Sequence, residues 1–109
     1  MTTEEIAQAI IGKSHTPQNA TLRMAAIYNL YKEGYKTQHI SYALHYHRSV
    51  IPYSNQKVLD LLDINDEVIK SSFEQLKEHT IRLVPYFERQ DGIQVVKAYV
   101  EIDNVKFIY

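Results

Sequence analysis

The stretch Thr37–Leu62, TQHISYALHYHRSVIPYSNQKVLDLL, decides the fold of the first half of the chain. Apolar residues recur at helical spacing over 38–44, which predicts a short helix with Thr37 as its N-cap. A polar turn at 45–47 precedes a second helix, expected from about residue 48 to residue 62. Two helices joined by a tight polar turn form the pattern of a helix-turn-helix.

Helical patterns also flank this stretch on both sides. Thr2 and Glu5 have the spacing of a capping box, which opens a first helix that Gly12 ends. The other expected elements are a loop over 14–21, a second helix over 19–33 that carries Arg23, and a fifth helix over 67–78.

Strand-forming residues replace the helical pattern near the C-terminus. β-branched and aromatic side chains predict strands over 81–87 and 93–102, and Gln90-Asp91-Gly92 between them is a hairpin turn signal. A second turn at Asp103-Asn104 leads into a short third strand over 105–109.

These elements predict an α+β fold in one domain. A bundle of four to five helices over 1–79 contains the helix-turn-helix, and an antiparallel β-meander of two to three strands over 80–109 packs on it. The 109-residue length fits a single domain.

Composition excludes several classes of site and points to a cytoplasmic protein. The chain has no cysteine, so disulfides, thiolate zinc sites and cysteine nucleophiles are ruled out. We find no apolar run of membrane-spanning length and no signal-peptide pattern at the N-terminus, and expect no membrane partner.

Charge is distributed unevenly along the chain. The net charge is −1, but residues 1–57 hold six basic and three acidic residues, whereas residues 58–109 hold six basic and ten acidic residues. Any contact with phosphate is therefore expected from the N-terminal half.

Polar side chains around the helix-turn-helix are the candidate DNA contacts. Arg48 could pair with guanine or phosphate, Lys57 could contact phosphate, and Ser54, Asn55 and Gln56 could reach base edges or the backbone. The candidate DNA-binding residues are His45, Tyr46, His47, Arg48, Ser49, Tyr53, Lys57, Arg23, Lys36 and Thr37.

Nine tyrosines are many for a chain of this length, and six of them surround the helix-turn-helix. Tyrosine can contact phosphate or stack on bases, but it also packs well in small cores. Of the six, we expect Tyr46 and Tyr53 to be exposed, and Tyr28, Tyr31, Tyr35 and Tyr42 to be core or half-buried.

Neither a metal site nor an enzyme active site is expected. His39, His45 and His47 lie close in sequence, but their spacing suits one helix face poorly and no carboxylate lies among them. Ser49 has His47 nearby, but the acid and oxyanion-hole motif of a catalytic triad are missing. We therefore expect no cofactor, no metal ion and no enzymatic activity.

The order of these features resembles the C-terminal DNA-binding domain of the bacterial replication initiator DnaA, a Trp repressor-like helix-turn-helix. The resemblance covers about residues 3–79. It is carried by Arg23-Met24-Ala25-Ala26-Ile27-Tyr28-Asn29-Leu30 in the second helix, and by Ile40-Ser41-Tyr42-Ala43-Leu44 in the third. The signature turn of that family falls on His45-Tyr46-His47-Arg48-Ser49-Val50.

The resemblance implies a DNA-binding fold with altered contacts. His45 and Tyr46 stand where the family has arginine and aspartate, and the loop over 14–19, basic in the family, is nearly uncharged. No nucleotide-hydrolysing domain accompanies it. The resemblance therefore implies a stand-alone bacterial or phage relative that reads a different DNA sequence from the initiator.

Two functions remain open from the sequence. One is a double-stranded DNA-binding regulator of transcription or replication, and the other is a protein–protein interaction module with a helix-turn-helix that no longer binds DNA. The β-meander either covers the helices of a monomer or pairs with a second copy, and we favour the homodimer because two half-sites double the contacts to DNA.

Overall fold

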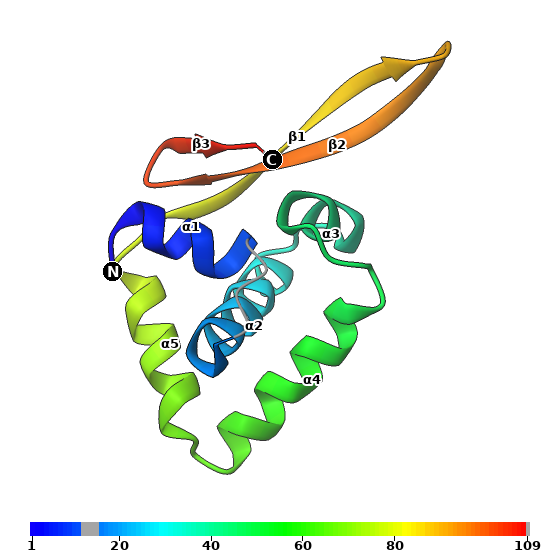
Figure 1. Ribbon diagram of the computed structural model, residues 1–109. Coiled ribbons are helices and arrows are strands. Elements are labelled where there is room, and N and C mark those ends of the chain that lie inside the picture. Colours follow the sequence, from blue (N-terminus) through cyan, green and yellow to red (C-terminus); the bar gives the residue numbers. More distant parts are fainter. Residues whose placement is uncertain (12–15, 109) are drawn as a thin grey trace.

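The computed structural model describes residues 1–11 and 16–108 and confirms the α+β prediction (Figure 1). The helices come first, and a three-stranded antiparallel sheet in the order β1-β2-β3 follows them. The elements are α1 (Thr3–Ile11), α2 (Pro17–Lys32), α3 (Thr37–Leu44), α4 (Val50–Asp63), α5 (Glu67–Lys77), β1 (Ile81–Gln90), β2 (Ile93–Ile102) and β3 (Val105–Phe107).

The start of α1 is the predicted capping box. The Glu5 amide donates to the Thr2 hydroxyl at 3.1 Å, and the Thr2 amide donates to the Glu5 carboxylate at 2.9 Å. The bond to the Thr2 backbone lowers the pKa of the Glu5 carboxyl. The expected helix end at Gly12 lies outside the described residues.

Helix α2 begins earlier than predicted. The polar segment 14–21 was expected to be a loop, but Pro17 occupies the first turn of the helix. Its missing amide costs nothing there, and the Thr16 hydroxyl accepts from the Asn19 amide at 3.3 Å. The expectation failed because a proline with polar neighbours is typical of the first turn of a helix as well as of a loop.

Helix α2 is the centre of the helical body. It contacts α1, α3, α4 and α5 (Figure 1). Its fully buried side chains, each at most 2 % exposed, are Leu22, Ala25, Ala26, Ile27 and Leu30. Two alanines among them bring neighbouring helices close to the α2 backbone, so this helix organises the core.

Two helix starts in the helix-turn-helix differ from the prediction. Lys36, not Thr37, is the N-cap of α3, and its side chain makes no capping hydrogen bond. Helix α4 starts at Val50 rather than near residue 48, so Arg48 and Ser49 belong to the turn. Pro52 does lie in the first turn of α4, as expected.

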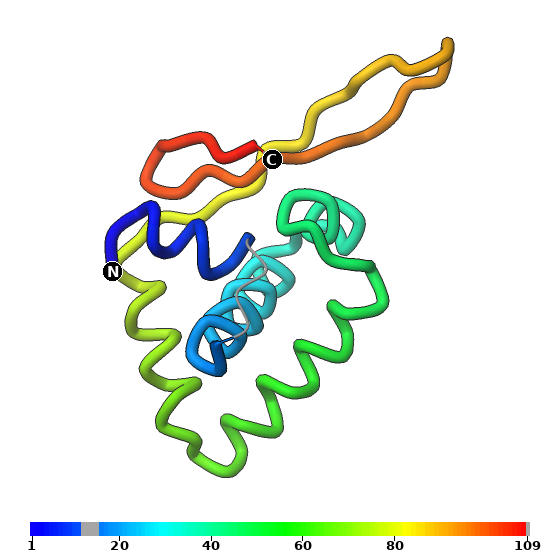
Figure 2. Tube along the Cα trace, viewed as in Figure 1, coloured from blue at the N-terminus to red at the C-terminus, as the bar shows by residue number. Residues whose placement is uncertain are grey.

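The sheet follows the predicted turns closely. Asp91-Gly92 and Asp103-Asn104 all have positive φ, the conformation of the two-residue hairpin turns that suit twisted strands. On one sheet face, Leu83 of β1 and Val100 of β2 are buried against the helices. The outer end of the β1–β2 hairpin extends away from the helical body (Figure 2).

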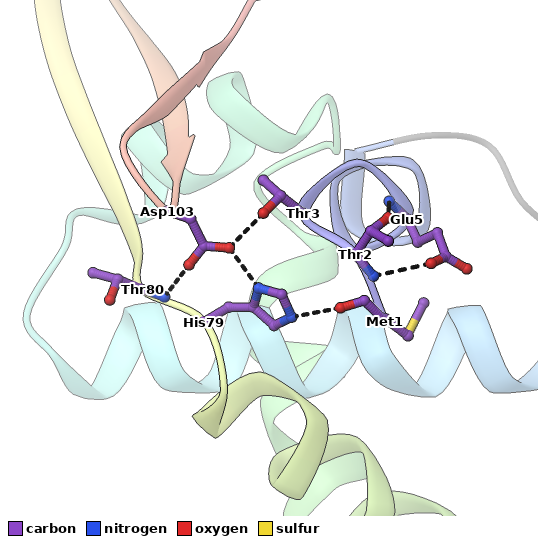
Figure 3. A network of polar contacts seen from close by, with 7 residues as sticks. All are labelled: Met1, Thr2, Thr3, Glu5, His79, Thr80 and Asp103. Atoms are coloured by element: carbon purple, nitrogen blue, oxygen red, sulfur yellow. Dashed lines mark hydrogen bonds and ion pairs between the residues drawn. The ribbon is translucent and has the colours of Figure 1, made fainter.

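A polar cluster joins the N-terminus to the sheet, and we call it the Asp103 network (Figure 3). The Asp103 carboxylate accepts from the Thr3 hydroxyl at 2.6 Å, the His79 Nδ1 at 2.6 Å and the Thr80 amide at 3.0 Å. The His79 Nε2 donates to the Met1 carbonyl at 3.0 Å. The three hydrogen bonds to Asp103, led by that of Thr3, lower the pKa of its carboxyl from 3.8 to about 2.

Across residues 1–11 and 16–108, none of the helices combines the length and the apolar character that crossing a membrane requires.

Candidate nucleic-acid interface

The turn between α3 and α4 is closed by the backbone. His45 adopts the left-handed conformation, with φ of 62°, and caps the C-terminal end of α3. The Tyr46 amide then donates to the Ser41 carbonyl at 2.9 Å. This is the arrangement that ends a helix and reverses the chain, and it brings residues 47–49 to the surface ahead of α4.

His47 and Ser49 form a local hydrogen-bonded pair within this turn. The Ser49 amide and hydroxyl lie 3.2 and 2.8 Å from the Nδ1 of His47. Because an amide can only donate, Nδ1 acts as the acceptor, and the neutral ring carries its proton on Nε2. His47 therefore offers an exposed N–H donor at the mouth of the turn.

The same pair has two of the three groups of a catalytic triad. A serine hydroxyl does lie on a histidine nitrogen, but no carboxylate in the described part of the chain bonds to His47. A hydroxyl nucleophile needs a base oriented by a third group and donors for an oxyanion. The contact is explained by the helix start, where His47 accepts from the Ser49 amide.

The Tyr46 side chain packs between the turn and the helical core. Its ring is half-buried against the core, and the Arg23 guanidinium of α2 lies 5.0 Å from the ring centroid. Burial raises the pKa of the Tyr46 hydroxyl, although the nearby Arg23 acts in the opposite direction. Tyr46 was expected to be exposed, and that expectation was wrong because its ring packs under the turn.

Arg23 therefore has a position the sequence pattern did not reveal. The prediction placed it among the DNA contacts, and the structure brings it, half-buried, against the Tyr46 ring. A cation over an aromatic face stabilises both groups where they are partly desolvated. The ring contact links the central helix to the turn that presents Arg48.

Helix α4 turns one polar face outward. Tyr53 is 71 % exposed, and Lys57 lies one turn further along the same face. Ser54, expected to reach toward bases, is 3 % exposed and faces the core. Asn55 is half-buried, with its side-chain oxygen buried, and Gln56 donates to the Asp60 carboxylate at 3.0 Å.

The tyrosines are distributed differently from the expectation. Tyr28 and Tyr35 are half-buried, as expected, and Tyr53 is exposed. Tyr31 and Tyr42, expected to be core or half-buried, are instead exposed, at 51 % and 41 %. Helix periodicity alone could not decide these cases, because a tyrosine on a helix flank can lie along the surface with its hydroxyl in water.

The candidate contacts fall into two groups in space. Residues 45–49, Tyr53 and Lys57 surround the turn and the first half of α4. Lys36 and Thr37 lie at the opposite end of α3, whose eight residues span about 12 Å at 1.5 Å each. The turn and the face of α4 thus form one surface, with Lys36 at its far margin.

The local charge of this surface is positive. No aspartate or glutamate occurs between Gly34 and Leu59, whereas Lys36, Arg48 and Lys57 are all exposed. Asp60 and Asp63 follow on the last turns of α4. A polyanion would therefore be attracted by Arg48 and Lys57 along the first half of α4 and repelled by Asp60 and Asp63 at its end.

A groove adjoins this surface. It has a volume of about 450 Å³ and separates α3 and the turn from the β2 strand. Its lining residues are Gln38, Ser41, Tyr42, Tyr46, His47, Arg48, Val95 and Val96, and none of them is acidic. Within residues 1–11 and 16–108, no group of three or more His, Cys, Asp or Glu side chains gathers closely enough to hold a metal ion.

No protein-family model, no curated protein and no solved structure matches this chain.

Proposed function

We propose that the protein binds double-stranded DNA in a sequence-specific manner through α3, the turn and α4, as a regulator of transcription or replication. One observation carries the proposal: the segment from Gly34 to Leu59 has no acidic residue, and it exposes Arg48 before the start of α4, Lys57 at the middle of α4 and Lys36 at the margin of the surface. A recognition helix contacts bases with its first residues, and backbone phosphates flank it on both sides. The resemblance of residues 3–79 to the DnaA C-terminal domain supports the same surface.

Each exposed side chain has a chemical role in this proposal. Arg48 has the bidentate donors that pair with the O6 and N7 of guanine, and Lys57 supplies a point charge for phosphate. His47 donates from its Nε2, and Tyr53 offers a hydroxyl to phosphate or its ring to a thymine methyl. Arg23 and Tyr46 hold the turn in place.

Selection of bound duplexes from a random pool, followed by fluorescence anisotropy, tests the proposal. Arg48→Ala should weaken binding by about 1–3 kcal/mol at one base position and relax specificity there. Lys57→Ala should weaken all duplexes alike and reduce the slope of log K against log salt by about 1.

Lys77→Ala is the matched control, since Lys77 is an exposed lysine on α5 with an ion pair to Glu74. It should leave affinity and salt slope unchanged. Absence of binding to every duplex at about 50 mM salt, a condition that strengthens phosphate contacts, would contradict the proposal.

The proposal includes a homodimer formed through the β-meander, because two-fold symmetry matches two half-sites on DNA. Size-exclusion chromatography with light scattering measures the mass directly. A single species near the chain mass of 12.7 kDa would reject the dimer.

A protein–protein interaction module is the second candidate. Four apolar side chains are exposed where α4 meets α5: Leu59, Leu62, Ile64 and Val68, of which Ile64 is 71 % exposed. Contiguous exposed apolar patches mark protein interfaces. This candidate predicts a partner protein that Ile64→Asp releases and that the Arg48→Ala and Lys57→Ala variants still bind.

A further inference from the structure

The outer part of the β1–β2 hairpin, residues 87–94, forms an arm that stands clear of the helices (Figures 1 and 2). Phe87 and Ile93 are 65 % and 67 % exposed on it. Val95 and Val96 at its base are half-buried and line the groove beside α3. A two-stranded ribbon is only marginally stable in water, and an exposed apolar ribbon is a template for further pairing. The arm therefore needs a partner to complete it.

The register shows which backbone groups of β2 are open. Gln90 and Ile93 flank a two-residue turn and form a hydrogen-bonded pair, as does every second pair along the ladder. Gln94, Val96 and Ala98 therefore direct their amide and carbonyl groups away from β1. Strand β3 pairs with β2 only over residues 100–102, so no strand among the described residues pairs with this edge over 93–99.

The other edge of the ribbon is closed. On β1 the alternate residues, among them Leu83, Pro85 and Phe87, direct their backbone groups outward. Pro85 has no amide hydrogen, so this edge lacks a donor at its middle. Proline on an edge strand prevents pairing with another chain, which leaves the β2 edge as the available one.

The open edge is complementary to itself. Lys97 is the only charged residue over 93–99, and its Nζ lies 2.5 Å from the Glu88 carboxylate of its own chain. An antiparallel pairing centred on Lys97 would place two lysines opposite each other. A pairing centred between Gln94 and Val96 places only apolar and amide side chains at the two-fold axis.

We propose that two copies of the chain pair antiparallel along the β2 edge, with the two-fold axis between Gln94 and Val96, so that the two sheets become one. Val95 and Val96 supply β-branched side chains to the cross-strand contacts, and each arm completes the other. This inference rests on the homodimer proposed above, and it does not depend on DNA binding.

Single-cysteine variants of the full chain test the axis. The natural sequence has no cysteine, so a cross-link from one introduced residue can only join two copies. Cα atoms facing each other in an antiparallel pair lie about 4.5–5.5 Å apart, within the range that a disulfide spans. Under mild oxidation, Val95→Cys, which faces its own copy across the axis, should give a covalent dimer on a non-reducing gel. Gln94→Cys and Val96→Cys face each other across the axis, so they should cross-link in a mixture of the two variants and much less when each is alone.

Phe87→Cys is the control, because Phe87 is more exposed than Val95 but belongs to the closed strand. It should form at least about tenfold less dimer, since its Cα atoms would lie beyond the disulfide range. Equal cross-linking of Phe87→Cys and Val95→Cys would overturn the proposal, because it would indicate collisions without a fixed axis.

Val96→Pro tests the edge without a cross-link. It removes an outward amide and leaves the ladder with β1 intact, as Pro85 does on the neighbouring strand. The dimer dissociation constant should rise about tenfold or more, because two symmetry-related hydrogen bonds are lost. Val96→Thr keeps the amide and the branched shape and should dimerise like the natural chain.

The outcomes separate the two proposals. A natural chain that remains at 12.7 kDa overturns the dimer and the edge together. A dimer that persists in Val96→Pro and shows no cross-linking of Val95→Cys overturns the edge alone. If circular dichroism shows that Val96→Pro is unfolded, the cysteine series decides the question by itself.

Discussion

Helices α2 and α4 are similar in length, with 16 and 14 residues, and are used in different ways. Helix α2 buries five apolar side chains and contacts helices on several sides. Helix α4 buries only Ile51, Ser54 and Val58 and leaves its opposite face in solvent. The difference shows where the sequence supplies stability and where it leaves a surface available for binding.

The largest expected effect comes from the central helix. Ile27→Ala deletes a side chain that is 1 % exposed at the middle of α2 and should lower the free energy of unfolding by about 3 kcal/mol. Urea unfolding at pH 7 measures it. Ile64→Ala, at the exposed end of α4, should change stability by less than about 0.5 kcal/mol. Equal losses at the two sites would contradict the contrast between the helices.

The next largest effect on stability is expected in the Asp103 network, outside α2 and α4. Asp103→Asn keeps an acceptor for the Thr80 amide and tolerates the positive φ, but it loses the charge facing Thr3 and His79. It should cost about 1–2 kcal/mol at pH 7, the range for hydrogen bonds to a charged group.

The pH dependence of that difference has a definite sign. The pKa of Asp103 is about 2 in the folded chain, below 3.8, so its contribution is present above about pH 4 and is lost as pH falls toward 2. The stability difference between the natural chain and Asp103→Asn should therefore shrink over this interval in urea unfolding. A difference that stays constant from pH 7 to pH 2 would show that the charge does not contribute.

A smaller effect on stability is expected where Arg23 of α2 contacts Tyr46 in the turn that leads into α4. Arg23→Ala removes the cation from the Tyr46 ring and should cost about 1 kcal/mol of stability. If Arg23 positions the turn, Arg23→Ala should also weaken DNA binding. Tyr46→Phe keeps the aromatic ring that Arg23 contacts and should leave DNA binding unchanged.

Lys32→Ala is the control for this coupling. Lys32 lies 5.5 Å from the Tyr28 ring, also on α2, but near the helix end that is remote from the turn. It should leave DNA affinity unchanged. A loss of affinity in both variants would mean that α2 acts through its charge and not through the position of the turn.

The smallest effect on stability is expected on the outer face of α4. Tyr53→Ala should change the free energy of unfolding by less than about 0.5 kcal/mol, because the side chain is 71 % exposed. Its DNA affinity should nevertheless fall, so thermal unfolding and anisotropy measured on one sample would separate the two roles. An unchanged affinity would remove Tyr53 from the interface.

Local signals in the sequence predicted most of the fold. The capping box at Thr2 and Glu5 and the turn at Asp91-Gly92 were found because their chemistry lies within a few neighbouring residues. The start of α4 was misplaced because Arg48 and Ser49 suit a turn as well as a first helical turn. Local preference leaves such boundaries open, and tertiary packing decides them.

The contacts that sequence reasoning missed are long-range. Nothing near Arg23 indicates that its guanidinium will meet Tyr46, and nothing near His79 indicates Asp103. Ser54 was assigned to the wrong face because a polar residue on a helix was expected to point to solvent. Such errors arise when the packing of neighbouring elements, unknown from one sequence, determines which side of a helix is covered.

The bond from Thr3 to Asp103 joins residues 100 positions apart, nearly the whole chain. Closing so long a loop costs more chain entropy than forming the adjacent helices, so this contact should form late in folding. Loss of a late contact accelerates unfolding and scarcely slows folding. The Asp103 network should therefore slow unfolding more than it speeds folding, so it determines the lifetime of the folded molecule rather than its rate of formation.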